Sequence, residues 1–119
     1  MATVLLVDDS RTSRKMLRSL LERNGFDIIG EAVNGEEGYL QYKELHPDIV
    51  TMDITMPVMD GIESLTLIKR EDANAKVDMI TAAGQKEKMV EALKRGAEEF
   101  ITKPFDEVEV LNTLRKVLG

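Results

Sequence analysis

The chain has 119 residues, of which 43% are hydrophobic and 32% are charged, and it contains no cysteine. This length suits one domain with a single core, so we expect one domain over residues 1–119. The formal net charge of -6 argues against nucleic acid as a direct ligand, because a phosphate backbone requires a basic surface. The lack of cysteine excludes disulfide and thiol chemistry and suits a reducing cytoplasm.

The N-terminal region shows no targeting signal. Its apolar run, residues 3–7, is too short for a signal peptide, and no basic segment precedes it. No stretch approaches the ~18 apolar residues of a membrane span. We therefore expect a cytoplasmic, monomeric protein that binds neither membranes nor nucleic acid.

Short apolar runs alternate with segments of helical periodicity along the chain. The runs with strand character are 3–7, 27–32, 48–52, 77–81 and 99–102. The helical segments between and after them carry apolar stripes at 16–21, 62–68, 89–93 and 110–118, with a weaker helix at 35–45. Asp60 and Asp106 each precede a glutamate by three positions, which is typical of a helix start. Gly25 and Gly96 stand where helices end.

Strands that alternate with helices imply parallel pairing with right-handed crossovers. The near-continuous apolar run at 4–7 fits a sheet that is covered on both faces. Five such units predict an α/β fold of the flavodoxin-like type, a doubly wound five-stranded parallel sheet, (βα)5.

Polar residues gather at the ends of the predicted strands, where ligands bind in such sheets. They are Asp8, Asp9, Asp53, Thr81 and the pair Lys103-Pro104. Each alone has an ordinary explanation as a turn residue, a helix cap or strand packing. Their coincidence at four strand ends of one topology favours a common site.

Three carboxylates in one cleft repel one another, so they take up a proton or recruit a cation. Oxygen ligands without histidine or cysteine favour a hard ion, Mg²⁺ before Ca²⁺. A carboxylate such as Asp53 can also attack phosphorus and form an aspartyl phosphate. That reaction mainly requires positioning and charge neutralisation, for which Lys103 offers a cation and Thr81 a hydroxyl donor.

Four segments resemble the receiver domain of bacterial and archaeal response regulators, and the resemblance covers the whole chain. They are VDDS at 7–10, DITMPVMDG at 53–61, TAAGQ at 81–85 and GAEEFITKPF at 96–105. Within this family the chain is most similar to stand-alone, CheY-type chemotaxis regulators. The resemblance implies the CheY-like strand order 2-1-3-4-5. It also implies a phospho-accepting signalling domain, not an enzyme, that promotes its own phosphorylation and dephosphorylation.

The resemblance assigns roles to the residues of the acid cleft. Asp53 is implied to take a phosphoryl group from the phosphohistidine of a CheA-like histidine kinase. Asp9, Asp53 and the backbone carbonyl of Thr55 are implied to bind Mg²⁺, with Asp8 helping through water.

The resemblance also implies how the signal is passed on. Thr81 and Lys103 would bind the phosphoryl oxygens, and the Lys103–Pro104 peptide bond would be cis. Thr81 and Phe100 would form the switch, although Phe100 can also be read as ordinary core. The fourth helix, fifth strand and fifth helix would then bind a flagellar motor switch protein or another phospho-dependent partner, and a phosphatase is a further implied partner. The alternative is a phosphorelay intermediate that passes phosphate to a histidine phosphotransfer protein.

Asp78 does not fit the predicted pattern, because it places a carboxylate inside an apolar run that should form an interior strand. It could lie near a solvent-facing start of the strand, pair with a basic residue, or mark an engineered or destabilised protein. We expect the first, since an unpaired buried carboxylate is costly.

The basic residues of the first helix are read as a solvated surface in preference to a kinase-docking face. They are Arg11, Arg14, Lys15 and Arg18. His46 precedes a proline and receives no role.

Other classes that use this architecture fit the sequence less well. A haloacid-dehalogenase-type phosphatase needs a second carboxylate two residues after its nucleophile, where this chain has Thr55. A flavin or nucleotide carrier needs a phosphate-binding loop after the first strand, where Asp8 and Asp9 would repel phosphate. A DNA-binding output is disfavoured because no helix-turn-helix segment follows the last helix.

Overall fold

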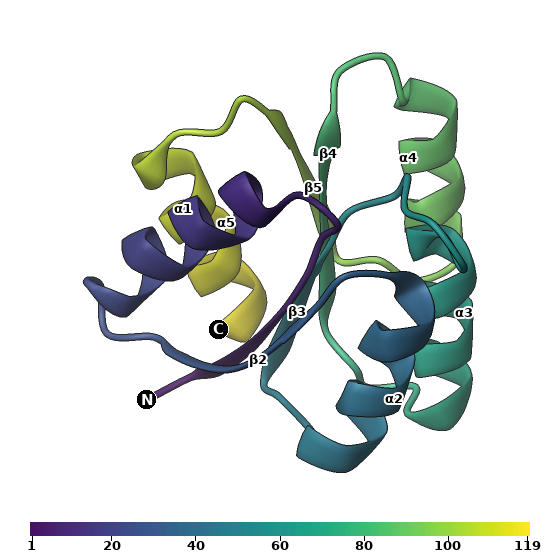
Figure 1. Cartoon of the computed structure of the whole chain (residues 1–119), viewed down its shortest axis with the longest axis horizontal. Helices are drawn as coiled ribbons and strands as arrows, with labels where there is room; N and C mark the ends of the chain where they lie inside the picture. The colour runs from purple at the N-terminus through teal and green to yellow at the C-terminus, as the bar shows by residue number, and fades with distance from the viewer.

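The computed structural model describes residues 1–119 as five strands and five helices in strict alternation (Figure 1). The strands are β1 (Thr3–Val7), β2 (Asp27–Ala32), β3 (Ile49–Met52), β4 (Val77–Ala82) and β5 (Glu99–Lys103). The helices are α1 (Arg11–Glu22), α2 (Gly35–Leu45), α3 (Gly61–Glu71), α4 (Lys86–Lys94) and α5 (Glu107–Leu118). Every predicted strand is present, and its ends agree with the prediction to within one residue.

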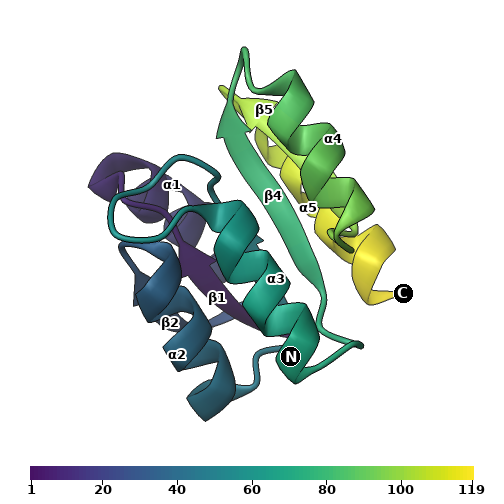
Figure 2. The same ribbon diagram turned by 90° about the vertical axis from the view of Figure 1, so that its right-hand side faces the viewer.

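The strands form one parallel sheet in the order β2-β1-β3-β4-β5, which confirms the predicted topology. Helices α1 and α5 cover one face of the sheet, and α2, α3 and α4 cover the other (Figures 1 and 2). Because all strands run the same way, the loops that follow them meet at one edge of the sheet. None of the helices combines the length and the apolar character that crossing a membrane requires.

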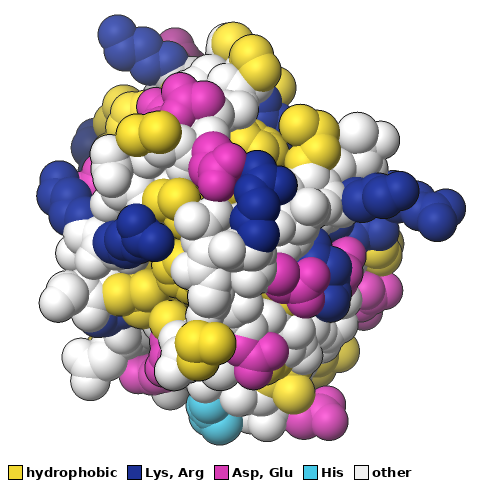
Figure 3. Space-filling view, turned by 90° about the vertical axis from the view of Figure 1, so that its left-hand side faces the viewer, with side chains coloured by type: hydrophobic (Ala, Val, Ile, Leu, Met, Phe, Trp, Pro, Cys, Tyr) yellow, Lys and Arg dark blue, Asp and Glu magenta, His cyan; other side chains and the backbone are white.

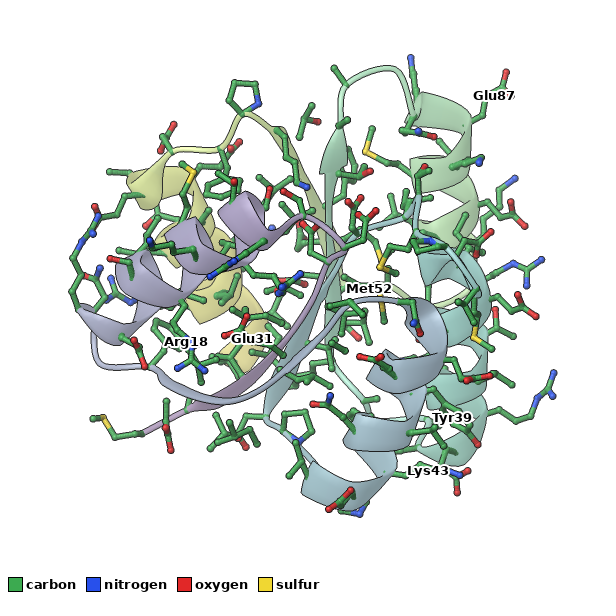
Figure 4. All side chains as sticks on the ribbon, viewed as in Figure 1. Arg18, Glu31, Tyr39, Lys43, Met52 and Glu87 are labelled. Atoms are coloured by element: carbon green, nitrogen blue, oxygen red, sulfur yellow. The ribbon has the colours of Figure 1, made fainter.

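The core is divided by the sheet into two apolar clusters. Val4 and Leu6 of β1 pack with α1 and α5, whereas Leu5 and Val7 pack with the helices of the other face. This alternation follows from the two-residue repeat of a strand. Met52, labelled in Figure 4, belongs to the second cluster and has no solvent exposure. Burial of each such side chain contributes about 1.5–3 kcal/mol.

Side-chain caps define where the helices begin. The Asp60 carboxylate accepts the Glu63 backbone N–H at 2.8 Å, and the Asp106 carboxylate accepts that of Glu109 at 2.8 Å. Both predicted starts are therefore confirmed. The weak helix predicted at 35–45 is also present, and Asn34 caps it by accepting the Glu37 N–H at 2.9 Å.

The apolar stripe of α4 only partly faces the core. Met89 is buried, but Val90 and Leu93 are exposed. Phe100 of the neighbouring β5 is also 43% exposed, so the interpretation of Phe100 as ordinary core is wrong. These three exposed side chains lie on two of the three elements of the predicted output face.

Asp78 is fully buried in β4, and neither of its carboxylate oxygens accepts a hydrogen bond. Its register partners are Thr51 on β3 and Glu99 on β5. The expectation that Asp78 lies at a solvent-facing strand start is wrong, because β4 is flanked by strands on both sides and covered by helices on both faces. No basic residue pairs with it either.

Candidate functional site

Three carboxylates meet at the carboxyl edge of the sheet, as the sequence predicts. Asp8 and Asp9 directly follow β1, and Asp53 directly follows β3, which is the neighbour of β1 in the sheet. One ligand oxygen from each of the three lies within 4.8 Å of the others. Asp8 and Asp53 are buried, whereas Asp9 is exposed. The cluster therefore has a closed side and a side open to solvent, where an ion could enter.

Lys103, the last residue of β5, reaches across the sheet edge to both buried acids. Its Nζ lies 2.8 Å from Asp8 Oδ2 and 3.3 Å from Asp53 Oδ2. The four-carbon side chain of Lys103 is long enough to place its ammonium group near the middle of the sheet. It can therefore bind Asp8, which lies 95 residues earlier in the sequence. The peptide bond between Lys103 and Pro104 is cis.

The surroundings of the cleft change the pKa of Asp8 and of Lys103. Burial raises the pKa of Asp8, and the Asp53 charge adds to this, although the hydrogen bonds from Lys103 and the Ser10 N–H act against it. Burial pulls the pKa of Lys103 down, but its hydrogen bond to Asp8 and the charges of Asp53 and Asp8 outweigh this and raise it. Lys103 therefore stays charged at neutral pH, as a cation for anionic groups in the cleft.

The backbone holds Asp53 in a fixed position. Its N–H donates to the Val7 carbonyl at 2.9 Å, and its Oδ1 accepts the Ile54 N–H at 2.7 Å. The loop after β3 then folds back, so that the Gly61 N–H donates to the Ile54 carbonyl at 2.7 Å. A Cβ on Gly61 would lie 1.9 Å from the Asp53 carbonyl oxygen, which only glycine avoids. The last glycine of the DITMPVMDG segment thus supports the carboxylate at its start.

Thr81 lies at the same edge, buried near the carboxyl end of β4. The next residue, Ala82, is the register partner of Lys103 on β5. Phe100 lies further back on β5 and pairs with Met79. Thr81 and Phe100 are therefore on neighbouring strands, and the ring of Phe100 is directed outward.

One contact at the mouth of the cleft was not anticipated from the sequence. Gln85 Nε2 donates to Thr55 Oγ1 at 3.1 Å and so connects the loops that follow β3 and β4. Gln85 belongs to the TAAGQ segment, but an amide in a loop gives no pairing signal in a single sequence. Arg14 was also missed as a support: its Nη1 donates to the Asp8 carbonyl at 2.6 Å.

Two of the four basic residues of α1, Arg14 and Arg18, form ion pairs within the domain. Arg14 and Arg18 both bind Glu31 of β2, at 3.0 Å and 2.8 Å, and Figure 4 shows Arg18 and Glu31 side by side. Basic, acidic and apolar side chains are interspersed on the side of the molecule that carries α1 and α5 (Figure 3). These observations support the interpretation of a solvated surface for this helix.

The comparisons with known proteins agree with this geometry. The family model of the response regulator receiver domain matches residues 4–115. The chemotaxis protein CheY of Thermotoga maritima is 48% identical over 114 residues, 96% of this chain and 95% of that protein. The CheY of Halobacterium salinarum is 50% identical over 115 residues, 97% of this chain and 95% of that protein.

A solved structure agrees as well. The crystal structure of the CheX-CheY-BeF3-Mg+2 complex from Borrelia burgdorferi contains a chain that matches with a TM-score of 0.95 and 43% identity, over 99% of this chain and 90% of that one. Sequence motifs, strand order and the acid cleft thus lead to one conclusion: this chain belongs to the response regulator receiver domain family.

Proposed function

We propose that Asp53 accepts a phosphoryl group from the phosphohistidine of a histidine kinase. The observation that carries this proposal is that the buried carboxylates of Asp8 and Asp53 both bind the ammonium of Lys103, beside the exposed carboxylate of Asp9. In the reaction, one Asp53 oxygen bonds to phosphorus while the P–N bond of the phosphohistidine breaks. The electron pair of the P–N bond stays on the imidazole nitrogen, which takes a proton from solvent, so no general acid is needed on this chain.

The donor set fits Mg²⁺, because it consists of oxygen atoms and has one solvent-exposed member for an ion to approach. Asp9, Asp53 and the Thr55 backbone carbonyl would hold the ion, with Asp8 acting through water. When bound, Mg²⁺ would neutralise charge on the phosphoryl oxygens and the carboxylates. Lys103 would bind a phosphoryl oxygen from the other side, since its ammonium already lies against Asp53 Oδ2.

Phosphorylation adds about 1.5–2 negative charges at the cleft. We expect the Thr81 hydroxyl to turn toward the new oxygens and the exposed ring of Phe100 to move toward the space beside it. Because Val90, Leu93 and Phe100 present apolar surface on α4 and β5, this movement would change a face that a partner can bind. The domain would also promote its own phosphorylation and dephosphorylation through the same residues.

The output partner is proposed from the relatives, since those named above are chemotaxis proteins. We propose a CheA-like kinase as donor and a flagellar motor switch protein as the phospho-dependent partner. A pull-down can test this by presenting the phosphorylated and unphosphorylated forms to a motor switch protein and to a histidine phosphotransfer domain. Retention on the switch protein only after phosphorylation is expected, whereas phosphate transfer to the phosphotransfer domain would indicate a relay.

The phosphorylation itself can be tested with acetyl phosphate and Mg²⁺ followed by intact mass measurement. The wild-type protein should gain one phosphoryl group, and Asp53→Asn should gain none. Asp60→Asn is the matched control, because it neutralises a nearby loop aspartate that only caps α3, and asparagine also caps helices well. Equal incorporation in wild type and Asp53→Asn, or none in either, would refute the assignment.

A further inference from the structure

The carboxyl group of Asp78 has no part in the acid cleft. It lies on β4 but on the opposite face of the strand from Thr81, because successive side chains alternate. It has 0% exposure, and both of its oxygens lack a hydrogen-bond partner. A buried carboxylate in this position either keeps its proton or forces the surrounding structure to admit water.

Helix α5 is the element that covers Asp78. Ile80, two residues further along β4 and therefore on the same face, packs in one apolar cluster with Leu114 of α5. Glu99, the register partner of Asp78 on β5, is bound by Lys116 of α5 at 3.3 Å. Two neighbours of Asp78 on its face of the sheet, Ile80 and Glu99, are thus linked to α5 by packing and by an ion pair.

No cation compensates the Asp78 carboxyl group. Burial is the main cause that raises the pKa of Asp78 to about 8, and the charges of Glu99 and Glu98 on the β5 side add to it. The Glu99 backbone N–H lowers the pKa of Asp78 less than these causes raise it, and it does not form a hydrogen bond with the carboxyl group. On β3 the neighbour is the uncharged Thr51, and the α5 cation Lys116 is bound to Glu99 with its side chain 73% exposed.

We propose that Asp78 is a proton-dependent switch beneath α5: the neutral carboxylic acid lets α5 pack on β4 and β5, and loss of the proton releases α5 from the sheet. An ionised Asp78 would be a third negative charge beside two glutamates with no donor to receive it. The least costly response is to admit water, and α5 is the outer layer that must move for this to happen. The proposal does not depend on phosphorylation of Asp53.

The direction of the pH effect follows from the pKa values of Asp78 in its exposed and its buried state. An exposed Asp78 titrates near its ordinary pKa of 3.8, whereas the buried group titrates near 8. The closed form therefore binds more protons between these values, so it loses stability as pH rises from about 4 to about 8 and changes little above. The equilibrium constant for opening should rise about tenfold per pH unit in this interval.

Amide hydrogen exchange on the full chain at pH 6 and pH 8, corrected for intrinsic rates, tests the proposal. In the wild type, amides of α5 and β5 should lose protection by about 50-fold, while those of α2 and α3 change little. Asp78→Asn keeps the shape but cannot titrate, so its α5 protection should not depend on pH in this way. Equal loss in Asp78→Asn, no loss in the wild type, or a uniform loss over all helices would each overturn the proposal.

A second measurement keeps the proposal testable if Asp78→Asn does not fold. The carboxyl ¹³C shift of Asp78 in the wild-type protein reports its titration directly, and the midpoint should lie near 8. In Glu99→Gln the midpoint should fall, because one of the two negative neighbours is removed. A midpoint near 4 in the wild type, or no shift in Glu99→Gln, would contradict the account.

Discussion

Two sets of buried acids differ in what surrounds them. Asp8 and Asp53 share the ammonium of Lys103, and each also accepts a backbone N–H from the loop that follows it. Asp78 has neither a cation nor a donor. The first two are buried at the end of a strand, whereas Asp78 is buried in the middle of one.

The difference shows why functional acids of such sheets stand at strand ends. Inside β4 the backbone N–H groups are used by the ladders to β3 and β5, so none is left for a side chain. Beyond a strand end the chain turns, and its N–H groups are free to bind a carboxylate. A carboxyl group beyond a strand end can therefore remain ionised, whereas a carboxyl group inside the strand, such as that of Asp78, favours the neutral form.

The largest expected effect comes from removing the shared cation. Lys103→Met leaves Asp8 and Asp53 without a cation, so phosphorylation by acetyl phosphate should slow by about 10²–10³-fold. Mg²⁺ should nevertheless bind more tightly, because the competing positive charge is gone. Phosphorylation kinetics and calorimetric Mg²⁺ titration measure the two effects.

Lys116→Met is the control for this prediction, because it removes a lysine that contacts only Glu99 on the surface. It should leave both measurements unchanged. An unaltered phosphorylation rate in Lys103→Met would show that the cation does not serve the cleft.

The acid without a partner should be dispensable for stability. Asp78→Val places a β-branched apolar residue in an interior strand and removes the unpaired carboxyl group. We expect the free energy of unfolding at pH 7.5 to rise by about 2–4 kcal/mol, and the gain to be much smaller at pH 5, where the wild-type carboxyl group is neutral in the folded state. Urea denaturation at both pH values measures this, and a gain that is the same at both would contradict the raised pKa.

Metal binding should raise the free energy of unfolding of the protein by about as much as Asp78→Val does. Mg²⁺ at a hundred times its dissociation constant should add about 2.7 kcal/mol to the free energy of unfolding. Asp9→Asn should remove most of this gain without harming the apoprotein, because Asp9 is exposed. The Mg²⁺ effect should also weaken as pH falls toward the raised pKa of Asp8, since protonation removes a negative charge. Thermal unfolding with and without Mg²⁺ tests both statements.

The smallest effect is expected at an aspartate that lies near the cleft but serves only a helix. Asp60→Ala removes the N-cap of α3 and should cost about 1 kcal/mol of stability. Phosphorylation should be nearly unchanged, because the Asp60 carboxylate binds the Glu63 N–H and no member of the cleft. A loss of phosphorylation as large as that expected for Lys103→Met would show that the site extends further than proposed.

The sequence was sufficient for the strands, the topology and the grouping of acids, because these follow from periodicity and from residues at strand ends. It failed for Asp78, since the cost of burying a charge argues for exposure while the strand's place between two neighbours requires burial. It also missed the Gln85–Thr55 contact, because a single sequence does not show which side chains of two loops will pair. It left open whether Phe100 is buried, because a single sequence does not show how far the helices cover the last strand of the sheet.

The most direct test of the central claim is to locate the phosphoryl group on the chain. After treatment with acetyl phosphate and Mg²⁺, borohydride reduces an aspartyl phosphate to homoserine with release of phosphate, and peptide mass spectrometry then identifies the reduced residue. We predict homoserine at position 53 alone, and none when acetyl phosphate is omitted. Homoserine at position 8 or 9, or none at position 53 despite a phosphoryl gain in the intact protein, would contradict the assignment of Asp53.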